Sequence, residues 1–165
     1  MAEADNHYYC ELLVVHNYTE AELRELWKKE YCQKMIFTHD HIRVHFYDNN
    51  FNHAFYESSV RNAGHNKKKS KDIFSRRRAS RMMWIKKVLA DPDAEMYVGY
   101  DNNLKKYSKT KRVSIVKGDY VVVIQFYKEG HARFITAYVA DKSINKIKNG
   151  PLWKNEKQDT KKDAD

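Results

Sequence analysis

The sequence predicts an α+β protein in which N-terminal helices are followed by a four-stranded antiparallel sheet. Apolar residues recur at helical spacing before residue 90, whereas residues 95–140 consist of short runs rich in β-branched and aromatic residues. A chain of 165 residues with 42% hydrophobic residues can bury one core, and its 5 Gly and 2 Pro exclude fibrous and low-complexity classes. The pattern divides into a strand–helix extension (1–36), a main domain (37–150) and a charged tail (151–165) that we expect to be disordered.

The N-terminal segment is expected to contain one strand and one helix. Residues 7–15 are rich in β-branched and aromatic side chains, which favour a strand. Thr19 and Glu22 form a capping-box pattern, which predicts that a helix begins there. The apolar residues of this helix recur at helical spacing and should face the core: Leu23, Leu26, Trp27 and Tyr31.

Residues 35–47 change to a two-residue period, which predicts a strand with one buried face. The apolar positions are Ile42, Val44 and Phe46. The polar positions are His39, His41, Arg43 and His45. Imidazoles at alternate strand positions can converge on zinc. Because an arginine stands among them and no carboxylate or cysteine completes the set, the row favours contact with RNA or solvent, and we expect no metal.

The middle of the chain predicts two helices separated by a basic loop. Residues 51–58 fit a short helix, residues 61–71 a polar loop, and residues 73–90 the clearest helix of the chain. Ser75 is a suitable N-cap, and the Asp91-Pro92 dipeptide should end the helix. The apolar stripe of this helix is formed by Met82, Ile85, Val88 and Leu89. Three arginines lie off the stripe and are expected to face outward or into a groove: Arg77, Arg78 and Arg81.

The C-terminal part predicts antiparallel hairpins. The strand-like runs are residues 95–100, 111–116, 119–127 and 131–140. The joins Lys117-Gly118 and Glu129-Gly130 are short turn signals of the kind that connect antiparallel strands. A short helix is expected at residues 143–148.

The positive charge is concentrated in one stretch. The net charge is +9, yet residues 61–88 alone hold 11 Lys and Arg residues and one Asp. Such density repels itself unless an anion lies nearby, and a phosphate backbone supplies that charge, so the sequence favours RNA as the partner. The expected RNA-binding residues are Lys67, Lys68, Lys69, Lys71, Arg76, Arg77, Arg78 and Lys86, with Arg112 and Arg133 in the later strands. No apolar run is long enough for a membrane span, and Cys10 and Cys32 fit reduced thiols, so we expect a cytoplasmic protein.

Two groups of residues carry candidate chemistry. His53 and Glu57 are four apart on the expected short helix, so an imidazole and a carboxylate would share one face, as a general acid–base pair requires. Thr136 and Tyr138 alternate along the last strand, where a hydroxyl and a phenol can hydrogen-bond a phosphate or stack on a base. Ordinary strand residues remain the alternative for the second pair. The absence of a Gly-rich phosphate loop and of a two-carboxylate metal motif disfavours nucleotide hydrolases and metal-dependent nucleases.

The order of motifs resembles a known group of small nucleases. A polar helix with His53 is followed by SRRRASRMMWIKKVLADPDAEMY, then KRVSIVKGDYVVVIQF, then ARFITAYVA. This series, over about residues 42–148, resembles the phage-associated nucleases of the BECR superfamily, the barnase, EndoU, colicin and RelE-like group. The resemblance implies N-terminal helices, a four-stranded antiparallel sheet, and metal-independent RNA cleavage without a cofactor.

The resemblance also implies roles for individual residues. The ribose 2′-hydroxyl would attack the adjacent phosphate, with His53 as acid–base catalyst and Arg81 as phosphate clamp. Lys86 would assist, while Thr136 and Tyr138 would position phosphate or base. His41 or His45 would replace His53 if the histidine row belongs to the active site. The substrate would be tRNA or mRNA, and a cognate inhibitor protein is a possible partner. Two alternatives stay open: an RNA- or DNA-binding protein of phage origin without catalysis, and a module that binds an acidic protein.

Overall fold

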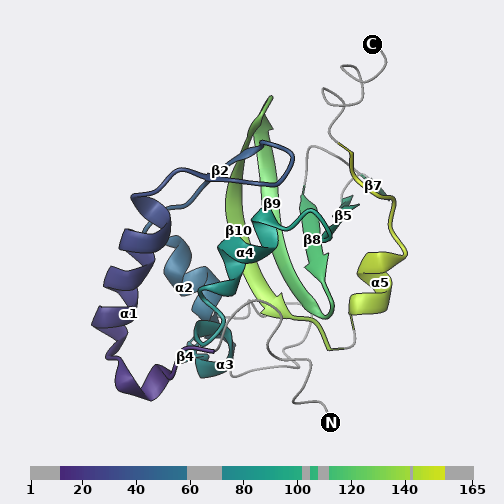
Figure 1. The fold of residues 1–165 in the computed structure, drawn as a ribbon. Coiled ribbons are helices and arrows are strands. Elements are labelled where there is room, and N and C mark those ends of the chain that lie inside the picture. Colours follow the sequence, from purple (N-terminus) through teal and green to yellow (C-terminus); the bar gives the residue numbers. More distant parts are fainter. Residues whose placement is uncertain (1–11, 59–71, 102–104, 108–111, 142, 155–165) are drawn as a thin grey trace.

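The structure is a computed structural model that describes residues 12–58, 72–101, 105–107, 112–141 and 143–154. Its centre is a six-stranded sheet (Figure 1). In spatial order the strands are β1 (Ile36–Phe37), β2 (Arg43–His45), β10 (His131–Val139), β9 (Tyr120–Lys128), β8 (Val113–Lys117) and β5 (Glu95–Val98). All neighbours are antiparallel except β2 and β10, which are parallel. The α+β class is therefore confirmed, whereas the expected four-stranded antiparallel sheet is corrected to a six-stranded mixed sheet.

The expected strand at residues 35–47 is a hairpin. The Thr38 hydroxyl accepts from the Ile42 backbone N–H at 3.0 Å, and His41 has a φ of 70°. This turn reverses the chain, so that Ile36 faces Val44 across β1 and β2. Ile42, Val44 and Phe46 are buried as predicted. The expected row of four polar residues is wrong, because only Arg43 and His45 remain on a strand.

The first helix belongs to the same core as the sheet. Helix α1 (Glu20–Trp27) has the predicted capping box at Thr19 and continues as a π-helical turn (Lys28–Cys32). The Trp27 ring packs against Phe134 of β10, with ring centroids 5.5 Å apart. Val15 lies in a 3-10 turn (Val15–Asn17) rather than in the expected strand, whose first residues lie outside the described part.

The expected long helix at residues 73–90 is broken. Its parts are β4 (Ile73–Phe74), α3 (Arg76–Ala79) and α4 (Trp84–Ala90). Between the helices, backbone N–H groups of residues 81, 82 and 84 bond to carbonyls three positions earlier, which is 3-10 geometry. The Ser75 cap and the end at Ala90 are confirmed, and all four predicted stripe residues are buried. Strand β4 pairs with β3 (Tyr56–Glu57), which ends helix α2 (Asn50–Phe55) earlier than expected.

The C-terminal hairpins follow the prediction. Gly118 and Gly130 have positive φ in the β8–β9 and β9–β10 turns. Helix α5 (Ile144–Lys148) is present as expected, and β6 (Tyr100–Asp101) pairs with β7 (Lys106–Tyr107). The Pro151 carbonyl accepts from Val98 N–H at 2.8 Å, so the start of the expected disordered tail lies against β5; residues 155–165 lie outside the described part.

The two faces of the sheet differ in what covers them. Helix α4 lies across one face (Figure 1), where its buried Ile85 and Leu89 share a core cluster with Ile115 and Val122. On the other face, Ile144 and Ile147 of α5 pack near Tyr97 and Val121, and Tyr138 packs against the same buried cluster. We call the side chains of β2, β10 and β9 that point away from α4 the open face, which is most exposed at Tyr127 and Arg133. No helix in the described part of the chain is long and apolar enough to cross a membrane.

Candidate nucleic-acid interface

The strand register places basic and aromatic side chains on the open face. Val44 of β2 and Ala132 of β10 are Cα partners, and both are buried in the core on the α4 side. Because successive strand residues point to opposite faces, their neighbours point the other way. The residues brought together there are Arg43, His45, His131 and Arg133.

Thr136 and Tyr138 continue the open face along β10. Their Cα partners on β9 are Val123 and Val121, so the two residues share a face, and Ile135 is the extra residue of a β-bulge. The Thr136 hydroxyl is buried and has no hydrogen-bond partner. Burial raises the pKa of the Tyr138 phenol, which therefore stays protonated and can donate. Only the Tyr138 phenol of this pair is accessible enough to donate to a ligand oxygen in this structure.

Arg78 connects three segments that are far apart in the sequence. Its Nε donates to a Glu57 carboxylate oxygen at 3.1 Å, and one Nη donates to the Ala54 carbonyl at 3.4 Å. Its guanidinium carbon lies 5.7 Å from the centre of the Tyr138 ring. We call Arg78, Glu57, Ala54, Tyr138 and the neighbouring His53 the Arg78 junction.

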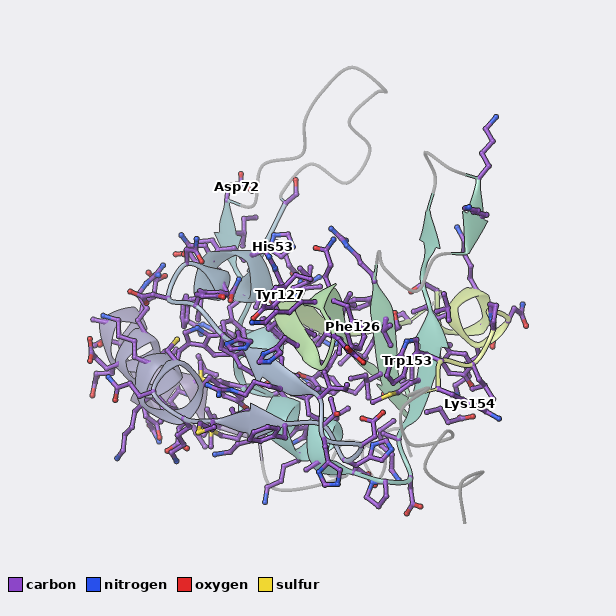
Figure 2. The ribbon with its side chains drawn as sticks, turned by 90° about the horizontal axis from the view of Figure 1, so that it is seen from above. His53, Asp72, Phe126, Tyr127, Trp153 and Lys154 are labelled. Atoms are coloured by element: carbon purple, nitrogen blue, oxygen red, sulfur yellow. The ribbon has the colours of Figure 1, made fainter. Side chains whose placement is uncertain are left out.

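His53 lies at this junction by its position on α2. It directly precedes Ala54, whose carbonyl accepts from Arg78, and its side chain is exposed. Figure 2 shows where His53 of α2 and Tyr127 of β9 lie when the molecule is seen from above. The expected His53–Glu57 pair on one helix face is wrong, because α2 ends at Phe55 and Glu57 is in β3. Glu57 pairs with Arg78 instead.

A second cluster lies at the other end of β10. His45 Nε2 and His131 Nδ1 are 3.0 Å apart, and the two rings stack with centroids separated by 5.3 Å. The Tyr127 ring centre is 5.7 Å from that of His45, and the Arg133 guanidinium lies 5.0 Å from it. Burial lowers the pKa of His45, and Arg43 lowers it further. We call His45 and His131 the histidine pair.

The sequence did not single out His131 or Tyr127. His131 is the first residue of β10 and Tyr127 is the second-last residue of β9, and both lie within strands that the sequence predicted. Only the parallel pairing of β2 with β10 brings His45 beside them. A pairing between strands separated by most of the chain leaves no local pattern to read.

Two of the expected site residues bond to the protein itself. Arg81, the expected phosphate clamp, is 6% exposed, donates to the Arg77 carbonyl at 2.8 Å and lies over the Trp84 ring, which corrects the expectation that it faces outward or into a groove. Lys86 Nζ lies 2.7 Å from a Glu30 carboxylate oxygen, on the α4 side.

The remaining residues that we expected to bind RNA differ in their exposure and in their ion pairs. Arg77 pairs with exposed Asp141 at 3.2 Å. Arg76, Arg112 and Arg133 are exposed. Lys67, Lys68, Lys69, Lys71 and Cys10 lie outside the described residues. Within the described part, no group of three or more His, Cys, Asp or Glu residues could hold a metal ion.

Comparison with known proteins adds no relative. No protein-family profile matches the chain, and neither the curated proteins nor the solved structures contain a significant match.

Proposed function

We propose that the protein is a metal-independent endoribonuclease that binds RNA along the open face and cleaves it at the Arg78 junction. The observation that carries the proposal is the contact set of Arg78, which brings the backbone next to His53 on α2 and the Tyr138 ring on β10 to one guanidinium. Ala54 and Tyr138 are 84 positions apart in the sequence, and Arg78 places a cation between the helix that carries His53 and the strand that carries Thr136 and Tyr138.

The chemistry needs no cofactor. The ribose 2′-hydroxyl attacks the adjacent phosphorus, the bond to the leaving 5′ oxygen breaks, and a 2′,3′-cyclic phosphate forms. His53 removes the 2′ proton, a step worth ~10²–10⁴ in rate for a well-placed base. A protonated acid, or water, returns a proton to the 5′ oxygen.

Arg78 replaces Arg81 as the proposed phosphate clamp. The Arg78 side chain remains 21% exposed beside Tyr138, whereas Arg81 is only 6% exposed. A planar guanidinium donates two parallel hydrogen bonds to phosphate oxygens and stabilises the charge that develops in the transition state. Tyr138 adds a hydrogen-bond donor on β10, next to the buried Thr136 hydroxyl.

The proposal is tested with purified full-length protein and RNA in EDTA. The wild-type chain should produce discrete fragments that end in 2′,3′-cyclic phosphate, and His53→Ala should lower the rate at least ~100-fold. The matched control is His16→Ala, because His16 is another exposed histidine and lies on the 3-10 turn before α1. This control should cleave like the wild type.

Two other outcomes overturn the proposal. RNA that stays intact but shifts on a native gel identifies a nucleic-acid-binding protein without catalysis. RNA that is neither cleaved nor bound favours an acidic protein partner, because the basic surface then has no phosphate ligand.

A further inference from the structure

The histidine pair lies among cationic side chains. Arg43 and Lys128 contribute positive charge at His45, and Arg133 is the Cα partner of His45 across the strand pair. Glu129 stands in the turn before His131 and is exposed. The imidazole contact of 3.0 Å requires one ring nitrogen to donate and the other to accept. The contact therefore allows the pair a net charge of zero or one, but both rings can be cationic only if the contact opens, as it could around a bound anion.

Tyr127 offers a flat surface next to this pair. It is 41% exposed, its ring meets that of His45 at an angle of 62°, and the Arg133 guanidinium lies 5.0 Å from its centre. A partly exposed phenol ring fixed by its neighbours, with an arginine beside it, is the arrangement on which unpaired bases stack. Cations that bind phosphate and a ring that binds a base thus occur within one cluster.

We propose that the histidine pair, Arg133 and Tyr127 form a second RNA subsite, which holds a phosphate and an unpaired base several nucleotides away from the bond that is cleaved. The proposal rests on the proposed function for the position of that bond, although binding at the subsite is independent of cleavage. The ligand class is single-stranded RNA, because a base inside a duplex is stacked on its neighbours and cannot reach Tyr127.

The spacing along β10 determines the length of RNA that is required. Tyr138 lies at the Arg78 junction and His131 in the histidine pair, and a strand rises ~3.3 Å per residue, so the seven steps between them span about 23 Å. Single-strand-binding domains commonly cover ~4–16 nucleotides. A trinucleotide is too short to occupy both clusters, whereas a decanucleotide is long enough.

Proton uptake should accompany binding. A phosphate placed against the pair offsets the burial and the positive charge that lower the pKa of His45, so affinity should rise as the pH falls from 8 to 6. Arginine and lysine side chains nearby stay charged over this range and contribute binding that does not depend on pH.

The experiment measures fluorescence anisotropy of labelled 2′-O-methyl oligonucleotides with the wild-type full-length chain and its variants. These ligands lack the free 2′-hydroxyl, so cleavage by the proposed chemistry does not interfere. Tyr127→Ala should weaken decanucleotide binding about tenfold and change trinucleotide binding less than twofold. Tyr18→Ala is the matched control, since Tyr18 is 38% exposed and lies next to the 3-10 turn before α1. A 10-base-pair duplex should bind Tyr127→Ala and wild type equally.

A second variant isolates the imidazoles. His131→Gln keeps hydrogen-bonding groups but cannot take up a proton, so it should reduce the pH dependence of the affinity, whereas His16→Gln should preserve it. The proposal is overturned if Tyr127→Ala binds the decanucleotide like Tyr18→Ala, or if His131→Gln leaves the pH dependence intact. If His53→Ala abolishes cleavage but Tyr127→Ala and His131→Gln bind RNA like the wild type, only the subsite proposal is wrong. If these two variants change RNA binding as expected but the wild type does not cleave RNA, only the catalytic proposal is wrong.

Discussion

The covered face and the open face of the sheet use the same kinds of basic side chain for different purposes. On the covered side, Lys86 lies against Glu30 and Arg81 is buried beside Trp84. On the open side, Arg78 and Arg133 lie against tyrosine rings and keep their guanidinium groups at or near solvent. Arg78 and Arg81 are only three residues apart, yet Arg78 is partly exposed beside Tyr138 and Arg81 is buried beside Trp84, because the helix is broken between α3 and α4.

This difference shows that a count of Lys and Arg residues in the sequence overestimates the number of side chains that can bind phosphate. Buried cations have exchanged water for protein partners and gain little from a phosphate. A partly exposed guanidinium keeps donors for a phosphate even when it is paired, because Arg78 uses only two of its five N–H groups for Glu57 and the Ala54 carbonyl. Variants of the two sides should therefore affect different measurements.

The largest effect is expected for Arg78→Ala. If Arg78 contacts the scissile phosphate, its loss should lower kcat/KM for RNA cleavage by ~100-fold or more. Arg78→Lys keeps the charge but not the paired donors, so it should recover only part of the rate. Arg76→Ala is the control, because Arg76 is exposed on the same short helix. Equal rates for Arg78→Ala and Arg76→Ala, after correction for the folded fraction, would contradict the assignment.

On the covered side, Arg81→Ala should act on stability. Removing a buried side chain that lies over the Trp84 ring should lower the free energy of unfolding by about 2 kcal/mol, measured by urea denaturation. Arg81→Met keeps an apolar stem and removes a buried Nε that has no hydrogen-bond partner, so it should lose less. Cleavage per folded molecule should stay normal in both variants. A large loss of cleavage in stable Arg81→Met would return Arg81 to the proposed site.

A smaller, pH-dependent effect is expected at the Lys86–Glu30 pair. Lys34 and Lys86 hold the pKa of Glu30 down to about 2 from an ordinary 4.5. A lowered pKa in the folded state stabilises the fold above the unfolded value and loses that contribution as the pH falls. Glu30→Gln should thus cost up to about 1 kcal/mol at pH 7, and the difference from wild type should disappear between pH 4.5 and 2. A difference that persists at pH 2 would exclude the ionic origin.

Local patterns predicted much of the fold, and long-range pairing explains what they missed. The capping box at Thr19, the stripe of α4 and the two glycine turns are properties of neighbouring residues, and all are present. The parallel partnership of β2 with β10 joins residues almost ninety positions apart and left no local signal.

The candidate site follows the same rule. Thr136 and Tyr138 share a face because strand alternation is local, apart from one bulge. The choice between Arg78 and Arg81 could not be made, because a continuous helix was expected where the chain breaks. His131 becomes a candidate only through its contact with His45, which lies on the adjacent strand β2 and 86 positions earlier in the sequence.

The most direct test of the central claim is photochemical cross-linking of a single-stranded RNA that carries 4-thiouridine, with the linked peptides identified by mass spectrometry. We expect cross-links on the open face, on the β9–β10 hairpin around Tyr127 and His131, and also on the segment that contains His53. Cross-links confined to α4 would contradict the account, because α4 covers the opposite face of the sheet.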